Sequence, residues 1–428
     1  MTHKQKSVIT SDIEGRIETF NQGAVEIFGY QPEEVIGKKR VSLFSPGHVV
    51  LQNVPNWLKV AREQGLYETK TVFINRDGSP IPAHVRITPT FKDGVQIGYC
   101  GVTEVLDDVD PSEIAPNISF ATKFFTWLVI TRAPFLTAII IPILIGAAWV
   151  AYQQLASPFP TALFFLTLFA GIFMHVSANT FNDYFDWTSG TDQINNEYFT
   201  PYTGGSRSIE LGLITPRQLF LVAFISLVAA SLLGLTLVIV SGLGVLVFGL
   251  IGAFSTYFYT APPLRLAARR GLGELTVFLN FGPLAVAGTV YALTGSVTLI
   301  DFLVGVPIGL LTTAILWVNQ LPDENSDRQA SKINLVVLLG KKRARWGYLV
   351  LMCATFGFIL YWLLIGTFPL GAGLALISLP IAWKASMTVL RDYDKRSLSQ
   401  ASAATIKVQL LAGLLMAAGL VLSTILIS

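Results

Sequence analysis

Long apolar stretches dominate this chain from about residue 124 onward and constrain its fold more than any other feature. A helix needs about 20 predominantly apolar residues to cross the hydrocarbon core of a membrane. Nine stretches have that character, at about 134–154, 161–181, 217–238, 241–261, 274–294, 299–320, 346–366, 369–390 and 403–427. Only 13% of the 428 residues are charged. We therefore expect a mainly α, polytopic membrane protein with nine transmembrane helices.

Basic residues occur only in alternate links between these stretches. The links near 155–160, 239–241, 295–298 and 366–369 contain no Lys or Arg. The intervening links, with the ends of the stretches beside them, hold Arg207; Arg265, Arg269 and Arg270; Arg328, Lys332, Lys341, Lys342, Arg343 and Arg345; and Lys384, Arg391, Lys395 and Arg396. Cytoplasmic loops are enriched in Lys and Arg. The pattern predicts a multi-pass protein of the cell inner membrane with a cytoplasmic N-terminus and its C-terminus on the opposite side.

The first hundred residues are polar and differ in pattern from the rest. Alternating runs at 69–74, 81–88 and 97–105 predict strands, with Asn75-Arg-Asp-Gly78 and Lys92-Asp-Gly94 as hairpin turns. A strand pair over 11–21 and short helices over 24–30 and 31–37 complete a soluble α/β domain. The first 20 residues lack the apolar core that a signal peptide has, so no signal peptide is predicted. The predicted domains are 1–106 (soluble), 107–123 (linker) and 124–428 (membrane).

Two acidic clusters adjoin apolar stretches on the predicted cytoplasmic side. They are Asn182-Asp183-Tyr-Phe-Asp186 with Asp192, and Asp323-Glu-Asn-Ser-Asp327. A spacing of four places Asn182 and Asp186 on one helix face, and the same holds for Asp323 and Asp327. Carboxylates near hydrocarbon are costly and imply a compensating cation. Carboxylate and amide oxygens suit Mg²⁺, which completes its shell with water and phosphate oxygens.

A single cluster of this kind is explained equally well by acidic residues that cap a helix in solvent and by a metal site. Two clusters with matching spacing, each at the cytoplasmic end of a span, favour a magnesium–diphosphate site instead. The predicted metal ligands are Asn182, Asp183, Asp186, Asp192, Asp323 and Asp327.

Nearby basic and hydroxyl side chains fit phosphate chemistry. Arg207 follows Gly204-Gly-Ser on a predicted turn, and a guanidinium there can bind two oxygens at once. The predicted diphosphate-binding residues are Arg207, Arg265, Arg328 and Lys332, and the predicted catalytic residues are Asp186, Asp327, Lys332 and Tyr259. Arg269, Arg270 and the basic run 341–345 are assigned to topology and lipid headgroups.

Two family resemblances follow from these residues. The "G.I..FN.gA..iFGY..eEviGk" pattern and the "R.DGs.ipa.v" hairpin make nearly all of the N-terminal domain resemble a PAS domain. Residues 125–428 resemble UbiA-type prenyltransferases, on the paired motifs at 182–192 and 323–332. The segment Tyr259-Thr-Ala-Pro-Pro-Leu-Arg265 is similar to a further family segment. This second resemblance implies a helical bundle with a central cavity, in which both motifs hold Mg²⁺ and an isoprenyl diphosphate.

The resemblance also implies transfer of the prenyl group to an acceptor that is usually aromatic. Leu321-Pro322 before the second motif, and the combination of NDYFD with GGSR, are similar to the naphthoate branch of the family. That branch implies 1,4-dihydroxy-2-naphthoate as the acceptor, in menaquinone biosynthesis. Ser331 departs from the family, in which a glycine usually precedes the lysine of the second motif.

Several alternatives stay open from the sequence alone. Other acceptors are a 4-hydroxybenzoate-like ring, a porphyrin derivative or a polar lipid. A non-enzymatic membrane sensor would leave the aspartates dispensable, and a transporter would place its polar groups near mid-bilayer. A PAS domain binds small ligands, haem or flavin, or forms dimers. His48 and His84 are the histidines in the body of this domain, and a lone histidine is more often structural than a haem ligand. Membrane lipid is an expected partner and nucleic acid is not.

Overall fold

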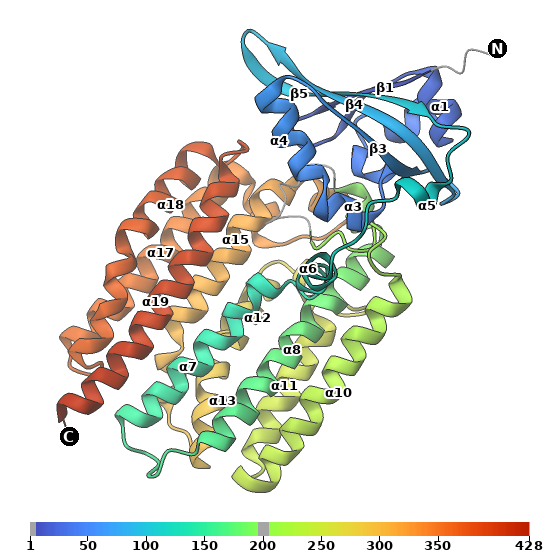
Figure 1. Ribbon diagram of the computed structural model, residues 1–428. Coiled ribbons are helices and arrows are strands. Elements are labelled where there is room, and N and C mark those ends of the chain that lie inside the picture. The colour runs from blue at the N-terminus through green and yellow to red at the C-terminus, as the bar shows by residue number, and fades with distance from the viewer. Residues whose placement is uncertain (1–5, 196–204, 428) are drawn as a thin grey trace. The chain divides into compact units, whose positions relative to one another are not determined.

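The computed structural model describes residues 6–195 and 205–427 (Figure 1). The chain divides into two compact units. The first unit is Met1–Ile130 with the segment Ser206–Thr215, and the second is Thr131–Gly205 with Pro216–Ser428.

The first unit is built on a five-stranded antiparallel sheet in the order β2-β1-β5-β4-β3. The strands are β1 (Ser7–Asp12), β2 (Ile17–Phe20), β3 (Tyr67–Ile74), β4 (Pro80–Lys92) and β5 (Val95–Val105). Its helices are α1 (Gln22–Phe28), α2 (Pro32–Val35), η1 (Val41–Phe44), α3 (Gly47–Gln52), α4 (Val54–Gln64), α5 (Pro111–Ile114) and α6 (Phe120–Ile130). The predicted strands and short helices are confirmed, with boundaries shifted by a few residues.

Local sequence signals account for the turns of this sheet. The Asn75 side chain accepts hydrogen bonds from the backbone N–H groups of Asp77 and Ser79, at 3.0 and 2.9 Å. Gly78 has a φ of 81°, a left-handed conformation that glycine adopts without a Cβ penalty. The core beneath the sheet is apolar, and the rings of Phe28 and Phe44 stack at 4.3 Å between centroids.

Helix α3 contacts two segments that lie beyond the sheet in the sequence. In α6, Thr122 donates to Oε1 of Gln52 at 2.6 Å, and Thr126 Oγ1 lies 3.1 Å from Nδ1 of His48. The backbone of Leu211 also packs against Gly47, where a Cβ would stand 2.2 Å from the Leu211 carbonyl oxygen. The segment Ser206–Thr215 therefore packs with the N-terminal unit, although it lies between two apolar helices in the sequence.

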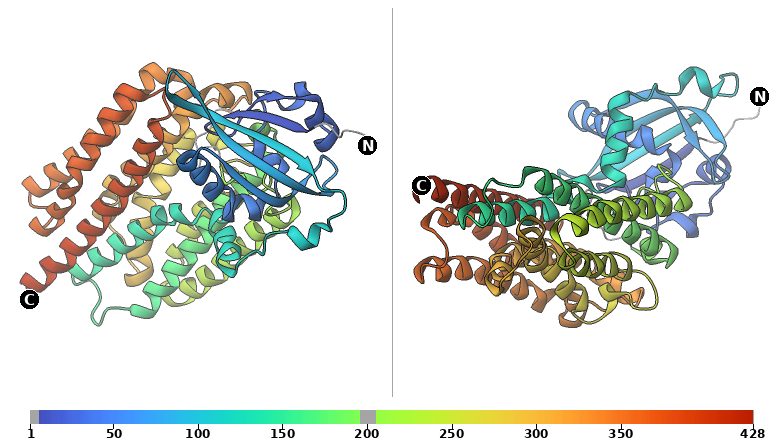
Figure 2. Two further views of the ribbon diagram at one scale, coloured as in Figure 1. Left: turned by 45° about the horizontal axis from the view of Figure 1, so that its top comes forward. Right: turned by 90° about the horizontal axis from the view of Figure 1, so that it is seen from below.

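The second unit is a bundle of long helices that run alongside one another (Figures 1 and 2). Its elements are η2 (Ala133–Leu136), α7 (Thr137–Tyr152), α8 (Thr161–Thr188), α9 (Thr191–Ile194), α10 (Pro216–Ser241), α11 (Gly244–Phe258), η3 (Leu266–Ala268), α12 (Leu272–Asn280), α13 (Pro283–Thr294), α14 (Leu299–Val304), α15 (Val306–Gln329), α16 (Leu335–Leu339), α17 (Lys341–Leu364), η4 (Leu370–Ser378), α18 (Leu379–Asp392) and α19 (Leu398–Ile427).

Eight helical segments of the described chain are long and apolar enough to cross a membrane. They span Ala133–Tyr152, Thr161–Thr188, Pro216–Ser241, Leu272–Thr294, Leu299–Gln329, Lys341–Leu364, Leu370–Asp392 and Leu398–Ile425. The remaining predicted stretch, 241–261, contains α11, an apolar helix of 15 residues that falls short of this length. Residues 6–195 and 205–427 therefore contain eight helical segments of spanning length, and the ninth predicted stretch holds the shorter α11.

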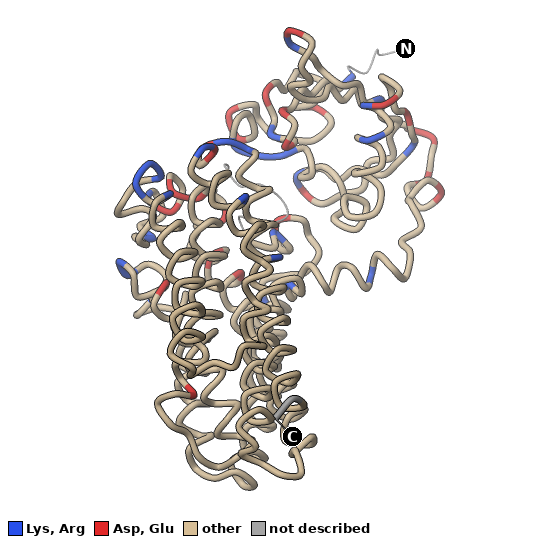
Figure 3. Tube along the Cα trace, turned by 90° about the vertical axis from the view of Figure 1, so that its left-hand side faces the viewer, with Lys and Arg blue, Asp and Glu red and all other residues tan. Residues whose placement is uncertain are grey.

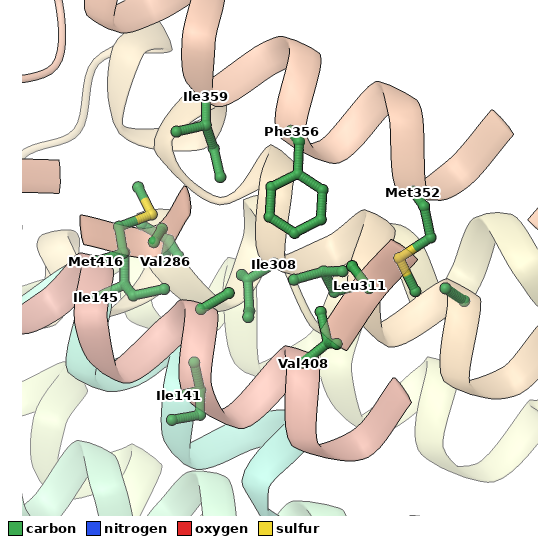
Figure 4. Close-up of a cluster of buried hydrophobic side chains, with 14 of the residues drawn as sticks. Ile141, Ile145, Val286, Ile308, Leu311, Met352, Phe356, Ile359, Val408 and Met416 are labelled. Atoms are coloured by element: carbon green, nitrogen blue, oxygen red, sulfur yellow. The ribbon is translucent and has the colours of Figure 1, made fainter. Parts of the chain in front are cut away.

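A continuous apolar core joins the helices of the bundle. Figure 4 shows part of it, with Ile141 and Ile145 from α7, Ile308 and Leu311 from α15, and Phe356 from α17 in one cluster. The charged residues of the bundle gather toward one end, and the opposite end shows very few (Figure 3). This separation places polar chemistry at a single end of the helices.

Candidate active site

A cavity of about 630 Å³ lies inside the second unit. Most of its wall is apolar and comes from α7, α8, α10, α11, α12, α13 and α15. A volume of this size accommodates a small organic ligand and leaves specificity to the few polar groups on the wall. Those polar groups include members of both acidic clusters.

Helix α8 brings the first cluster to the cavity. It continues to Thr188, so the whole Asn182–Asp186 motif is helical. Asn179, Asn182 and Asp186 follow one another at spacings of three and four, and all three line the cavity. The chain then turns at Gly190, whose φ is 81°, and α9 places Asp192 on the same wall. Asp186 and Asp192 therefore line the same cavity.

Helix α15 brings the second cluster to the same cavity. This helix continues past Pro322 to Gln329, and Asn319, Asp323 and Asp327 lie on one stripe of it that lines the cavity. Asp327 is 5% exposed. Carboxylates that are about 130 residues apart in the sequence therefore face one space.

Lys332 connects the two clusters electrostatically. Its Nζ lies 3.3 Å from Oδ2 of Asp186 and 3.9 Å from Oδ1 of Asp327. Burial alone lowers the pKa of this lysine, but the two carboxylates together raise it above the ordinary value. The ammonium is therefore charged, and it partly offsets the repulsion between the acidic groups.

Two amide side chains position the carboxylates. Asn334 is fully buried and donates to Oδ2 of Asp327 at 2.7 Å. Its own Oδ1 accepts from the backbone N–H of Val337 at 2.8 Å and caps α16. Asn195 donates to Oδ1 of Asp323 at 2.9 Å. The second cluster is thus held by hydrogen bonds from outside its own helix.

The structure places the predicted basic residues and Tyr259 in different environments. Lys332 and Tyr259 line the cavity. Arg265 and Arg328 are not among its lining residues in the described chain, and Arg328 instead contacts Glu324 and donates to the Val337 carbonyl at 2.8 Å. Arg207 belongs to the first unit, where it pairs with Glu210 at 3.0 Å. Gly204, named with Arg207 in the sequence, lies outside the described residues.

Arg132 is a site residue that the sequence did not single out. It lines the cavity, and its Nη1 lies 3.3 Å from Oδ1 of Asn182 and 3.6 Å from Oδ1 of Asp183. Asp183, which was predicted as a metal ligand, therefore pairs with a guanidinium and is not among the lining residues. A basic residue two positions before Pro134, at the start of the first span, was the available signal for Arg132.

The side chains that face the cavity fit a diphosphate-bound Mg²⁺ better than a metal held by protein alone. No group of three or more His, Cys, Asp and Glu lies close enough to hold an ion by itself in the described part of the chain. Four carboxylates from α8, α9 and α15, with Asn182 and Asn319, nevertheless face the same space. Mg²⁺ takes few protein oxygens and fills its remaining positions with water and substrate phosphates. The donor set therefore fits that ion.

Comparisons with known proteins agree with this geometry. The family model for the UbiA prenyltransferase family matches residues 139–408, and a PAS domain model matches residues 5–109. A 1,4-dihydroxy-2-naphthoate octaprenyltransferase from Escherichia coli is 30% identical over 303 residues, 69% of this chain and 95% of that protein. A protein of the same name from Mycobacterium tuberculosis is 31% identical over 278 residues, which are 64% of this chain and 90% of that protein.

A solved structure has a similar fold. The apo structure of a UbiA homolog from Aeropyrum pernix covers 66% of this chain and 97% of its own, with a TM-score of 0.50 and 14% identity. At that identity the likeness concerns the fold alone, and it is the helical bundle that the two proteins share.

Proposed function

The chain belongs to the UbiA prenyltransferase family and carries a PAS domain, and from this we propose that it prenylates 1,4-dihydroxy-2-naphthoate in menaquinone biosynthesis. The observation that carries the proposal is that Asp186 and Asp327, from two separate motifs, face one cavity on either side of Lys332. The naphthoate acceptor is supported by the relatives of that name and by the sequence of the two motifs.

In this proposal the acidic end of the cavity binds the diphosphate and the apolar wall binds the isoprenoid tail. Asp186, Asp192, Asp323 and Asp327 would hold Mg²⁺, which would supply Lewis-acid stabilisation of charge on the leaving group. Lys332 donates to diphosphate oxygens as the allylic C–O bond lengthens, and the Tyr259 hydroxyl offers a further donor on the wall. The apolar wall keeps water away from the allylic carbon until a carbon of the aromatic ring captures it, and that ring carbon then releases the group it carried, as a proton or as CO₂.

The membrane orientation forms part of the proposal. The charged residues of the bundle gather at one end (Figure 3), and both acidic clusters adjoin links that carry Lys and Arg. The positive-inside rule then places the active site at the cytoplasmic face of the inner membrane, with the C-terminus on the other side.

The acceptor is tested by competition in purified protein. With Mg²⁺ and a prenyl diphosphate, we expect kcat/KM for 1,4-dihydroxy-2-naphthoate to exceed that for 4-hydroxybenzoate by about 100-fold or more, since acceptors that differ in their polar groups are discriminated strongly. Product masses from equimolar mixtures give the ratio directly. Equal use of both rings, or preference for a porphyrin or a polar lipid, would assign the enzyme to a different acceptor.

We also propose that the PAS domain regulates the transferase through the segment Ser206–Thr215. This segment packs with the PAS domain at Gly47. The preceding residue, Gly205, belongs to the other unit, where a Cβ on it would stand 3.1 Å from Oδ1 of Asp183. A shift of the PAS domain is therefore transmitted along the chain to a residue beside the first acidic motif.

This coupling predicts the effect of a single methyl group. In Gly47→Ala the new Cβ meets the Leu211 carbonyl oxygen at 2.2 Å, so the segment must move. We expect KM for the prenyl diphosphate to rise by up to about tenfold, because small misplacements of binding groups weaken catalysis. Gly101→Ala is the matched control, since its Cβ meets only the Ile9 carbonyl oxygen, at 3.9 Å. Identical kinetics for the two variants would contradict the coupling.

A further inference from the structure

His175 is a buried polar residue in the cavity that the proposed mechanism does not use. It lies on α8, seven residues before Asn182 and eleven before Asp186, and all three line the cavity. At 1.5 Å per residue, it lies about 10 Å along the helix from Asn182, toward the middle of the span. It is 6% exposed, and neither ring nitrogen has a hydrogen-bond partner among the described residues.

A break in the neighbouring span faces this histidine. The ring of Phe281 meets the imidazole edge-on, with 5.0 Å between centroids and an interplanar angle of 82°. Phe281 and Gly282 separate α12 from α13, and the break is closely packed, since a Cβ on Gly282 would stand 2.6 Å from the Gly305 carbonyl oxygen. Broken spans at membrane depth occur where they line a cavity and commonly form substrate sites.

The chemistry of His175 points to a polar ligand group rather than to packing. A buried polar side chain without a hydrogen bond is costly, and an ionisable residue inside a span is usually kept for function. The wall also carries the hydroxyls of Thr167, Thr289 and Thr312, but each of them already donates to a carbonyl of its own helix. A neutral imidazole carries one donor and one acceptor nitrogen, which suits a ring hydroxyl and an adjacent oxygen.

We infer that His175 binds a ring hydroxyl of the aromatic acceptor and so orients the acceptor beside Phe281. This inference rests on the proposed function, because it assigns the acceptor end of the same cavity. The diphosphate occupies the end with Asp186 and Asp327, and the acceptor occupies the deeper position marked by His175. The hydroxyl donates a hydrogen bond to an imidazole nitrogen, and this contact fixes which ring carbon faces the allylic carbon. His175 is thus a specificity-determining residue.

A double-mutant cycle between protein and acceptor tests this contact in the full-length protein. The substitution is His175→Leu, and the ligand change replaces one acceptor hydroxyl at a time by its methyl ether, which cannot donate a hydrogen bond. In wild type, we expect the ether of the contacted hydroxyl to raise the acceptor KM by about tenfold or more. In His175→Leu the same ether is expected to change KM by less than about twofold. The KM for the prenyl diphosphate stays unchanged.

Further variants separate this contact from misfolding and from failure of the proposed function. His175→Gln keeps a hydrogen-bonding side chain and is expected to recover part of the acceptor affinity. His84→Leu makes the same change in the PAS domain and is expected to leave the cycle as in wild type. If every ether raises the acceptor KM by the same factor in wild type and in His175→Leu, the inference is wrong, although prenyl transfer itself stands. If wild type prenylates no hydroxylated aromatic ring, the proposed function fails first.

Discussion

Replacing Asp327 or Asp186 by Ala is expected to lower the rate of prenyl transfer by about 10³-fold or more. Each substitution removes hard oxygen ligands from the wall on which both motifs converge. Charge on the departing diphosphate then loses stabilisation that acts in a water-poor site, where one such interaction is worth about 10²–10³ in rate. The measurement is prenylated product per unit of folded protein in membranes, determined by mass spectrometry.

The two motifs are further expected to act as one unit. Residues that act together in a site show strongly non-additive losses. The double variant of Asp186 and Asp327 should therefore be only slightly less active than either single variant. Asp394→Ala is the matched control, because it removes an exposed carboxylate from the link between α18 and α19. Near-normal turnover in Asp186→Ala or Asp327→Ala, with the control unchanged, would remove the basis for the site.

Replacing Lys332 by Met is expected to change turnover and metal binding in opposite directions. The ammonium lies 3.3 Å from Asp186 and 3.9 Å from Asp327, so its loss leaves these two carboxylates without that cation. Prenyl transfer should fall by about 10²-fold or more, since a donor to the leaving group is lost. Affinity for Mg²⁺ in the absence of substrate should rise, since the local negative potential increases.

Rate assays and isothermal titration with Mg²⁺ measure the two effects separately. Lys332→Arg keeps the charge and should restore part of the rate without raising the metal affinity. Lys342→Met removes an exposed positive charge at the start of α17 and should alter neither quantity. A fall in both turnover and Mg²⁺ affinity in Lys332→Met would mean that the lysine only supports the fold of the site.

Much of the fold followed from periodicity and charge. The strands of the PAS domain carry period-two patterns bounded by Asn75-Arg-Asp-Gly78 and Asp93-Gly94, so their positions were predictable within a few residues. Apolar length located the spans, but it could not show that α11 is only 15 residues long, because the apolar run continues into both neighbouring loops. The break at Phe281–Gly282 lies inside a predicted apolar stretch, so apolar length alone did not show it, although polar Asn280 and the pair Gly282-Pro283 mark it in the sequence.

The site was predictable where it depended on spacing along one helix. The stripes that contain Asn182 and Asp186, and Asp323 and Asp327, follow from the helical repeat. Partners outside the two helices were not predictable in this way. Arg132 pairs with Asp183 because separate segments pack together, and Asn334 reaches Asp327 because the chain turns back after α15. Arg328 follows the second motif in sequence, but its helix position turns it toward Glu324 and away from the cavity lining.

Prenyl transfer by purified full-length protein tests the central claim most directly. The protein is incubated with a prenyl diphosphate and 1,4-dihydroxy-2-naphthoate, with Mg²⁺ or with a chelator, and the products are measured by mass spectrometry. We predict a product in which the naphthalene ring carries the prenyl group. This product forms only with Mg²⁺ and is lost in Asp327→Ala. Absence of any prenylated product with Mg²⁺ present, or equal amounts with the chelator, would contradict the account.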